Sequence, residues 1–249
     1  MAARGPLPLP REHGAWAMLS LSLLAGWMAG PVRDPWAAAG AAFAAICVFL
    51  AQAAWLAPPS VRRRIWLGLE LGLAVPFATI ALLRGGHPSG VWGGFAAATG
   101  LAALMWRRGS TNAAGRVALK AWGAHLLAAF SMGLLASWVA VCGGDGSDPV
   151  RLALALSSNF TAGVLLVRAL RGGASGGDRA LLLWALGVAL AWCALGDAAR
   201  PLALLVWIPL PLRWILARIR PGASWRALGL LETALGICMT AGAVALSRG

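Results

Sequence analysis

The chain has 249 residues, of which 60% are hydrophobic and 12% are charged, and its formal net charge at neutral pH is +13. Its mean hydropathy of +0.76 excludes an ordinary water-soluble domain and is typical of integral membrane proteins. The positive charge does not predict a nucleic-acid partner, because the basic residues lie between apolar segments rather than along one soluble surface. The sequence therefore predicts one integral membrane domain, residues 1–249, surrounded by membrane lipids.

Apolar runs bounded by Arg, Pro, Gly and Asp predict an all-α transmembrane helical bundle with about nine spans. An α-helix rises about 1.5 Å per residue, so about 20 apolar residues cross the hydrocarbon core of a bilayer. In chain order the expected spans are 13–32, 36–57, 64–83, 90–106, 117–142, 150–170, 179–196, 199–217 and 225–247. Pro209 and Pro211 predict a kink in the eighth of these spans.

The basic residues alternate between the two sides of this expected bundle. Lys and Arg in short loops are biased to the cytoplasmic side, so the basic side is assigned to the cytoplasm, together with the N-terminus. That side holds Arg4, Arg11, Arg62, Arg63, Arg64, Arg107, Arg108, Arg116, Lys120, Arg168, Arg171, Arg179, Arg213, Arg218, Arg220 and Arg226. The other side holds only Arg33, Arg84, Arg151, Arg200 and Arg248.

Ionisable side chains within the expected spans are candidates for function, because such groups are costly in a membrane and usually face the bundle interior or a wet cavity. Glu70, His125, Arg213 and Glu232 are each expected about 7–9 Å inside the cytoplasmic boundary. This shared depth predicts a polar pocket that opens to the cytoplasm. Each residue also has a purely structural interpretation: Arg213 could extend to the interface, and Glu232 could pair with an arginine that joins two helices.

Two other polar or small-residue features lie within expected spans. Asn159 falls near the middle of the sixth span, where an interhelical hydrogen bond is its ordinary role. Gly68 and Gly72 form a G-x-x-x-G pair in the third span, which is typical of close helix packing.

Familiar enzyme signatures are absent from the sequence. There is no phosphate-binding Gly-Lys loop, no G-x-S-x-G, no H-E-x-x-H and no Asp-rich motif for magnesium and pyrophosphate. The Cys and His residues have no metal-ligand spacing. The sequence therefore predicts neither a metal nor a cofactor, and it leaves open whether the protein is an enzyme.

The segment PREHGAWAML, residues 10–19, resembles the start of the YwiC-like family of bacterial integral membrane proteins. Weaker similarities are LAQAAWLAPPSVRRR, which ends at Arg64, VLLVRALR at 164–171 and LGLLE at 228–232. These motifs touch both ends of the chain, so the resemblance covers nearly all of it. It implies a multi-pass protein of the bacterial cytoplasmic (inner) membrane.

The nine-span arrangement is also similar to that of UbiA-type prenyltransferases, which the resemblance implies as distant fold relatives. Those enzymes hold magnesium and a prenyl diphosphate with two Asp-rich motifs. This chain departs from that pattern, because it has Arg62, Arg63 and Arg64 after the second span and only Asp178 after the sixth. Arginines could instead bind an anionic head group directly, through charge-assisted hydrogen bonds without a metal.

These observations favour a protein that binds or modifies an amphipathic isoprenoid or anionic lipid in a cytoplasm-facing polar pocket. Glu70, Glu232 and His125 are the candidates for an acid, base or orienting group. The substrate-binding candidates are Arg11, Glu12, His13, Trp16, Arg62, Arg63, Arg64, Asn159, Arg168 and Arg213. Two alternatives stay open: a small-solute or proton-coupled transporter, and a non-catalytic membrane subunit that docks a partner. The sequence predicts no oligomeric state.

Overall fold

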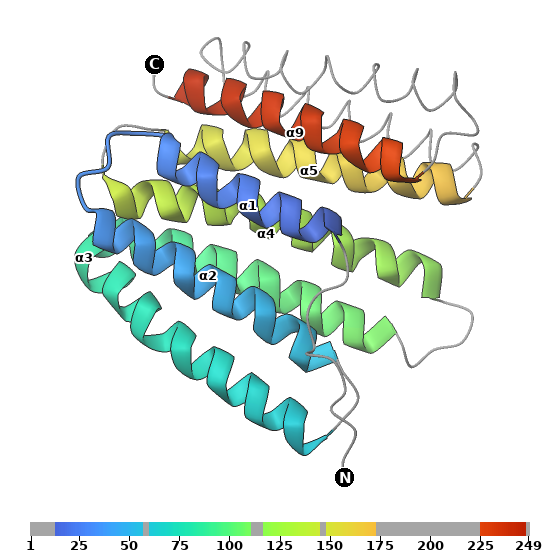
Figure 1. Ribbon diagram of the computed structural model, residues 1–249, viewed down its shortest axis with the longest axis horizontal. Helices are drawn as coiled ribbons and strands as arrows, with labels where there is room; N and C mark the ends of the chain where they lie inside the picture. Colours follow the sequence, from blue (N-terminus) through green and yellow to red (C-terminus); the bar gives the residue numbers. More distant parts are fainter. Residues whose placement is uncertain (1–12, 57–59, 111–116, 145–147, 173–224, 248–249) are drawn as a thin grey trace.

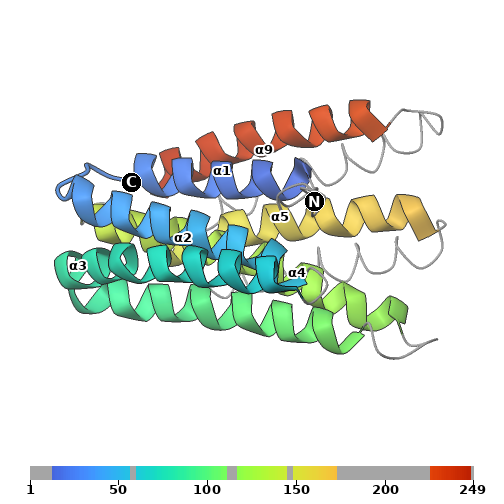
Figure 2. The same cartoon turned by 60° about the horizontal axis from the view of Figure 1, so that its bottom comes forward.

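A computed structural model describes residues 13–56, 60–110, 117–144, 148–172 and 225–247. Within these ranges every regular element is an α-helix and none is a strand, which confirms the all-α prediction for this part of the chain. The helices are α1 (His13–Met28), α2 (Pro35–Leu56), α3 (Val61–Ser110), α4 (Val117–Gly143), α5 (Pro149–Gly172) and α9 (Trp225–Ser247). They lie side by side with their long axes roughly aligned, as Figure 1 and Figure 2 show from two directions.

Three of the described helices are long and apolar enough to cross a membrane: α2 through Pro35–Gln52, α3 through Arg63–Met105 and α4 through Leu126–Gly143. Shorter apolar stretches, Trp16–Met28 and Glu232–Leu246, occupy α1 and α9. These apolar helices indicate a membrane protein. Every expected span that falls on described residues has a helix at its place, whereas the expected spans 179–196 and 199–217 lie outside the described residues.

The long helix α3 consists of two helical segments that meet at Gly86. Gly86 has φ 67° and ψ −166°, a conformation that is open to glycine and strained for residues with a Cβ. Pro88 stands two residues later, at a helix start where its missing N–H removes no hydrogen bond. The chain therefore turns back on itself here, and the two segments correspond to the third and fourth expected spans (Figure 1).

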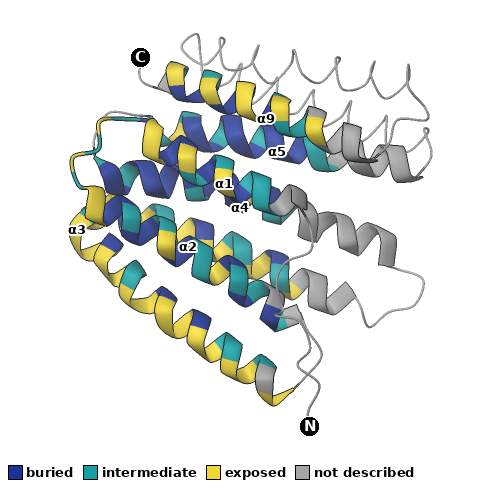
Figure 3. Ribbon diagram, viewed as in Figure 1, coloured by how far each residue is buried: buried dark blue, intermediate teal, exposed yellow. Residues whose placement is uncertain are grey.

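Helix α4 is the centre of the described bundle, because it packs against α1, α2, α3 and α5. From Ala129 to Gly143 most of its side chains are buried, as Figure 3 shows for both α4 and α5. Glycine allows the closest contacts: a Cβ at Gly133 would lie 2.7 Å from the carbonyl oxygen of Ala153 on α5. Close backbone approach at small residues is the usual way in which membrane helices associate.

Helix α3 is by contrast the most exposed of the three long apolar helices. Only 17% of its apolar stretch is buried, against 67% for α4. In Figure 3 its first segment forms an outer edge of the bundle and is mostly exposed. Gly68 and Gly72 lie on this helix with nothing within 4 Å of a Cβ placed on either residue. Their predicted role in close helix packing therefore has no partner among the described residues.

The α1–α2 and α4–α5 connections, which lie at the same end of the bundle, are held by short-range polar contacts. Asp34 and Asp148 each precede a proline that begins a helix, and each carboxylate accepts a backbone N–H in the first turn: Ala37 at 2.9 Å and Arg151 at 3.1 Å, respectively. The backbone amides of Arg33 and Asp34 also donate to the carbonyl oxygen of Gly143, at 2.6 and 3.0 Å. These bonds tie the α1–α2 connection to the end of α4.

Candidate functional site

Most basic residues of the described helices lie at one end of the bundle. Helices α1, α3, α4 and α9 begin at this end, and α2, the second segment of α3 and α5 finish there (Figure 1). The helix ends there carry Arg62, Arg63, Arg64, Arg107, Arg108, Lys120, Arg168, Arg171 and Arg226. We call this the basic end. The described connections at the opposite end carry Arg33, Arg84 and Arg151 beside Asp34 and Asp148.

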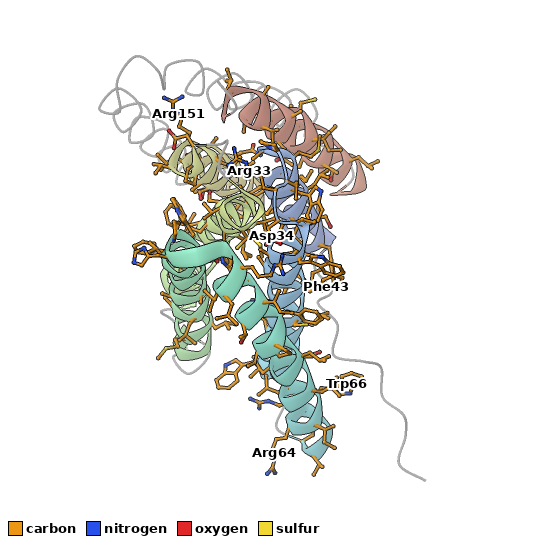
Figure 4. The ribbon with its side chains drawn as sticks, turned by 90° about the vertical axis from the view of Figure 1, so that its left-hand side faces the viewer. Arg33, Asp34, Phe43, Arg64, Trp66 and Arg151 are labelled. Atoms are coloured by element: carbon orange, nitrogen blue, oxygen red, sulfur yellow. The ribbon has the colours of Figure 1, made fainter. Side chains whose placement is uncertain are left out.

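Cationic and aromatic side chains from two helices meet at the start of α3. Ser60 accepts a hydrogen bond from the Arg63 amide at 3.1 Å and so caps the helix. The guanidinium carbon of Arg63 lies 5.8 Å from the ring centre of Trp55 in the last turn of α2, within the range of a cation–π contact. Arg64 is exposed, and Figure 4 shows Arg64 and Trp66 projecting from the start of α3. Such a pairing of arginine with tryptophan is typical of a membrane–water interface.

Glu70 is buried although it stands on this largely exposed helix. Its relative exposure is 8%, and its Oε2 atom has no hydrogen-bond partner among the described residues. Glu70 shares a helical stripe with Ala74, Phe77 and Ala81, and the last two of these pack against α2 and α4. The exposed neighbours are Leu69, Leu71, Leu73 and Val75. The carboxyl therefore points into the bundle while the apolar side chains point outward, which is the reverse of a soluble helix.

Helix α2 packs against α3 and runs antiparallel to its first segment, which carries Glu70. Two turns further from the basic end, Phe43 and Phe77 stack with ring centres 5.3 Å apart (Figure 4). Glu70 thus lies between an aromatic stack on one side and the Trp55–Arg63 contact on the other, enclosed in the α2–α3 interface.

Trp16 of α1 contacts α2 in the half of α2 that is nearer the basic end. Its ring meets the buried ring of Phe49 edge to face, with centroids 4.9 Å apart and an interplanar angle of 74°. His13 is the first residue of α1, so the backbone of the predicted N-terminal motif also enters at the basic end. The structure therefore places the starts of α1 and α3 and the end of α2 at the same end of the bundle (Figure 1).

Other candidate residues lie on a different side of the bundle. Glu232 is half-buried in the second turn of α9, a helix that packs against α1 and α5 rather than against α3. Asn159 is buried in α5 with an exposure of 2%. Glu70 and Glu232 thus share a distance from the basic end, but they stand on helices that do not pack against each other. The structure places Trp16 and Arg63 against α2, through Phe49 and Trp55, whereas Glu232 lies on a helix that packs against α1 but not against the helix of Glu70.

The remaining candidates divide into two groups. His13, Arg62, His125 and Arg168 lie in described helices at the basic end, but their side chains are outside the described part of the structure. Arg11, Glu12 and Arg213 lie outside the described residues altogether. Within the described part, no three His, Cys, Asp or Glu side chains are grouped so as to hold a metal ion.

A second buried polar cluster, which the sequence did not predict, lies at the turn of α3. The indole N–H of Trp138 donates to Ser89 Oγ at 3.1 Å, and Ser89 donates to the Ala81 carbonyl oxygen at 3.1 Å. Cys142 Sγ lies 3.0 Å from the same hydroxyl. All of these side chains are buried and satisfied by one another, so this cluster joins helices rather than binding a ligand. The only signal in the sequence is a serine directly after the RGGHP break.

Comparisons of this chain with protein-family models, with curated proteins and with solved structures found no match. Support for a function therefore comes from the candidate site at the basic end. Its described components are the cationic and aromatic start of α3, the Trp16–Phe49 contact and the buried carboxyl of Glu70.

Proposed function

We propose that this chain is a YwiC-like, multi-pass protein of the bacterial cytoplasmic membrane that binds an amphipathic isoprenoid or anionic lipid at its basic end. One observation carries the proposal: the guanidinium group of Arg63 lies over the ring of Trp55, and Arg64 and Trp66 project from the start of α3, about two turns from the buried carboxyl of Glu70 (Figure 4). This arrangement offers cationic groups, interfacial aromatic rings and a buried hydrogen-bonding group along one helix.

The two parts of an amphipathic ligand fit different parts of this helix. A phosphate or carboxylate head group would take charge-assisted hydrogen bonds from guanidinium groups at the helix start. An acyl or isoprenoid chain would lie along the exposed apolar face that includes Leu69, Leu73 and Val75. Glu70 points into the bundle instead, so it would orient, protonate or deprotonate only a polar group that enters between α2 and α3.

The chain has arginine residues after its second span, where UbiA-type prenyltransferases have an Asp-rich motif, and this difference changes the way in which an anionic head group can be bound. UbiA-type prenyltransferases use carboxylates to hold magnesium, whereas a magnesium site cannot be built from guanidinium groups such as those of Arg62, Arg63 and Arg64. We therefore propose direct recognition of the anionic head group by arginine. A distant UbiA-like fold, with about nine spans and a cytoplasmic N-terminus, belongs to the same proposal.

The test is mass spectrometry of the lipids retained by the protein in native nanodiscs. Arg63→Ala/Arg64→Ala removes two guanidinium groups at the basic end, and Arg84→Ala/Arg151→Ala is the matched control at the opposite end. Both control arginines sit in partly exposed ion pairs, which contribute little to stability. We expect one isoprenoid or anionic lipid to be enriched in the wild type and in the control, and to be lost from Arg63→Ala/Arg64→Ala. Bulk lipid in all three samples would contradict the proposal.

A second candidate function, proton-coupled transport of a small solute, is favoured by Glu70 alone. Membrane-embedded carboxyls without a fixed partner are typical of proton relays in transporters. Reconstituted vesicles with a pH gradient would test it, with Glu70→Gln as the inactive variant and Glu232→Gln as the comparison. Uptake that requires Glu70 and the gradient would favour transport over lipid binding.

A further inference from the structure

We propose that Glu70 is a proton-binding site, a neutral carboxylic acid that is held between α2 and α3 in the resting protein. This inference does not rest on lipid binding, because it follows from the surroundings of one side chain. It assigns a proton to a defined carboxyl within an apolar helix.

The surroundings of Glu70 do not compensate a negative charge on its carboxyl. Glu70 is more than nine-tenths buried, and its Oε2 atom has no hydrogen-bond partner among the described residues. It lies within the apolar stretch Arg63–Met105. A carboxylate at such a place would lose its hydration without gaining a donor, whereas the neutral acid loses far less.

Titratable and charged groups also lie on α3 and on the helices that pack against it. On α2 the described group is Cys47, whose thiol carries no positive charge. On α4 the described group is Cys142, which lies at the turn of α3 beside Ser89, while the side chains of Lys120 and His125 are outside the described part of the structure. On α3 itself the nearest cations are the exposed Arg64, six residues and about 9 Å along the helix axis towards the basic end, and then Arg63, one residue further. Its guanidinium group lies against the ring of Trp55.

The other described acids differ from Glu70 in their partners or in their exposure. Asp34 and Asp148 each accept backbone N–H groups and each pair with an arginine, at 2.8 and 3.0 Å. Both are also partly exposed, so both are satisfied as carboxylates. Glu232 is half-buried on a helix that does not pack against α3. Among the described residues, Glu70 alone combines a buried carboxyl with an unpartnered oxygen.

The deciding experiment is infrared difference spectroscopy of the full chain in nanodiscs, comparing the wild type with Glu70→Gln across a pH series. We expect the wild type to show the C=O stretch of a protonated carboxyl at neutral pH, and Glu70→Gln to lack it. Above its midpoint this band should decrease about tenfold per pH unit. A Glu232→Gln control should keep the band. A spectrum in which Glu70→Gln removes only carboxylate bands at neutral pH would overturn the proposal.

Chemical labelling and stability provide independent readouts. Dicyclohexylcarbodiimide, an apolar reagent that reacts with protonated carboxyls, should modify Glu70 in preference to Asp34 and Asp148. Glu70→Gln should keep the thermal stability of the wild type, because a neutral amide replaces a neutral acid. His125→Gln, which removes a titratable group from α4, should leave the C=O band unchanged. A C=O band that appears only in His125→Gln, together with a loss of stability in Glu70→Gln, would show that Glu70 is an ion-paired carboxylate in the wild type and would overturn the proposal.

Failure of the proton site and failure of lipid binding are distinguishable. If no lipid is selectively retained, the protonated C=O band still establishes the proton site. If the band is absent but Arg63→Ala/Arg64→Ala loses a specific lipid, head-group binding stands and the neutral carboxyl does not.

Discussion

At the contact between α4 and α5, Gly133 lies against the backbone of the neighbouring helix. A Cβ at this position would stand 2.6 Å from the Ser157 amide nitrogen and 2.7 Å from the Ala153 carbonyl oxygen. Ser157 also crosses the contact, because its hydroxyl donates to the Phe130 carbonyl oxygen at 3.0 Å. A side chain at Gly133 would therefore push two backbones apart and weaken this hydrogen bond.

Gly133→Ala is expected to destabilise the protein by about 1–3 kcal/mol, the usual effect of adding volume to a packed contact. Thermal unfolding in detergent measures it. Gly72→Ala is the matched control, because a Cβ there meets nothing within 4 Å and alanine has the higher helix propensity. Equal losses in the two variants would mean that α4 and α5 do not pack as closely as described.

The hydroxyl of Ser89 accepts the indole N–H of Trp138, so Ser89→Ala would leave that buried donor without a partner. We expect a loss of about 1 kcal/mol in the free energy of unfolding, in line with hydrogen bonds between membrane helices. Ser20→Ala on the exposed face of α1 is the control and should change little. Unchanged stability of Ser89→Ala would contradict the described hydrogen bond.

At the start of α2, the charge of Asp34 contributes stability that is lost at acid pH. The hydrogen bond from the Ala37 amide, together with the Arg84 guanidinium, lowers the pKa of Asp34 against the opposing effect of partial burial. A lowered folded-state pKa stabilises the fold fully above the unfolded-state value of about 3.9. This contribution disappears as the pH falls through the lower folded-state value.

Asp34→Asn, which keeps an oxygen acceptor but removes the charge, should therefore lose less stability than the wild type between pH 6 and about pH 3. Asp34→Ala removes the cap as well and should already be less stable at neutral pH. Thermal unfolding across this pH range checks both. If the wild type and Asp34→Asn lose stability in parallel on acidification, Asp34 is not ionised against Arg84 and Ala37 in the folded protein.

The turn within α3 depends on one backbone conformation. Gly86→Ala should destabilise the protein by about 1–3 kcal/mol, because φ 67° with ψ −166° is strained for a residue with a Cβ. Gly90→Ala, four residues later, meets only ordinary contact with Leu82 and should be tolerated. Thermal unfolding of the two variants measures the loss of stability at each position, and a larger loss in Gly86→Ala is the effect of backbone strain. Equal stability would mean that the two segments of α3 are joined in another way.

The helices themselves were predictable from the sequence, because each expected span on described residues is an apolar run closed by proline, glycine or a charge. The break between the third and fourth spans was visible as Arg84-Gly-Gly-His-Pro. The pairing of helices was not predictable, because alanine-rich faces such as that of α2 fit many neighbours equally well. Gly68 and Gly72 show the consequence: the spacing indicated a contact that the described helices do not make.

The sequence indicated how far the candidate residues lie from the basic end, but it did not indicate on which side of the bundle each of them lies. Glu70 and Glu232 both lie about two turns from the basic end, as their spacing from neighbouring arginines indicated. Their separation onto α3 and α9 depends on helix order in space, which hydropathy does not encode. Burial of Glu70 followed from its stripe with Ala74 and Ala81, whereas its unpartnered oxygen required the positions of α2 side chains.

Across the described part of the molecule, exposure increases outward from a central helix. The centre, α4, is packed on several sides, while α3 turns leucine, valine and phenylalanine side chains outward and directs Glu70 and Ser89 inward. Water would not stabilise this arrangement, because a large apolar surface would remain hydrated. A lipid environment removes that cost and leaves buried polar groups as the specific contacts. The same distribution makes the two ends chemically different, since one is rich in arginine.

That difference predicts the orientation of the protein in its membrane: arginine-rich connections are retained in the cytoplasm, so the basic end should face inward. In a variant with all four cysteines replaced by alanine, Ser60→Cys reports the basic end, and Val150→Cys and His87→Cys report the other. All three positions are exposed. A membrane-impermeant maleimide should label Val150→Cys and His87→Cys in intact cells and Ser60→Cys only in broken cells. Labelling of Ser60→Cys from outside would place Arg63 and Glu70 on the far side of the membrane and exclude a pocket that opens to the cytoplasm.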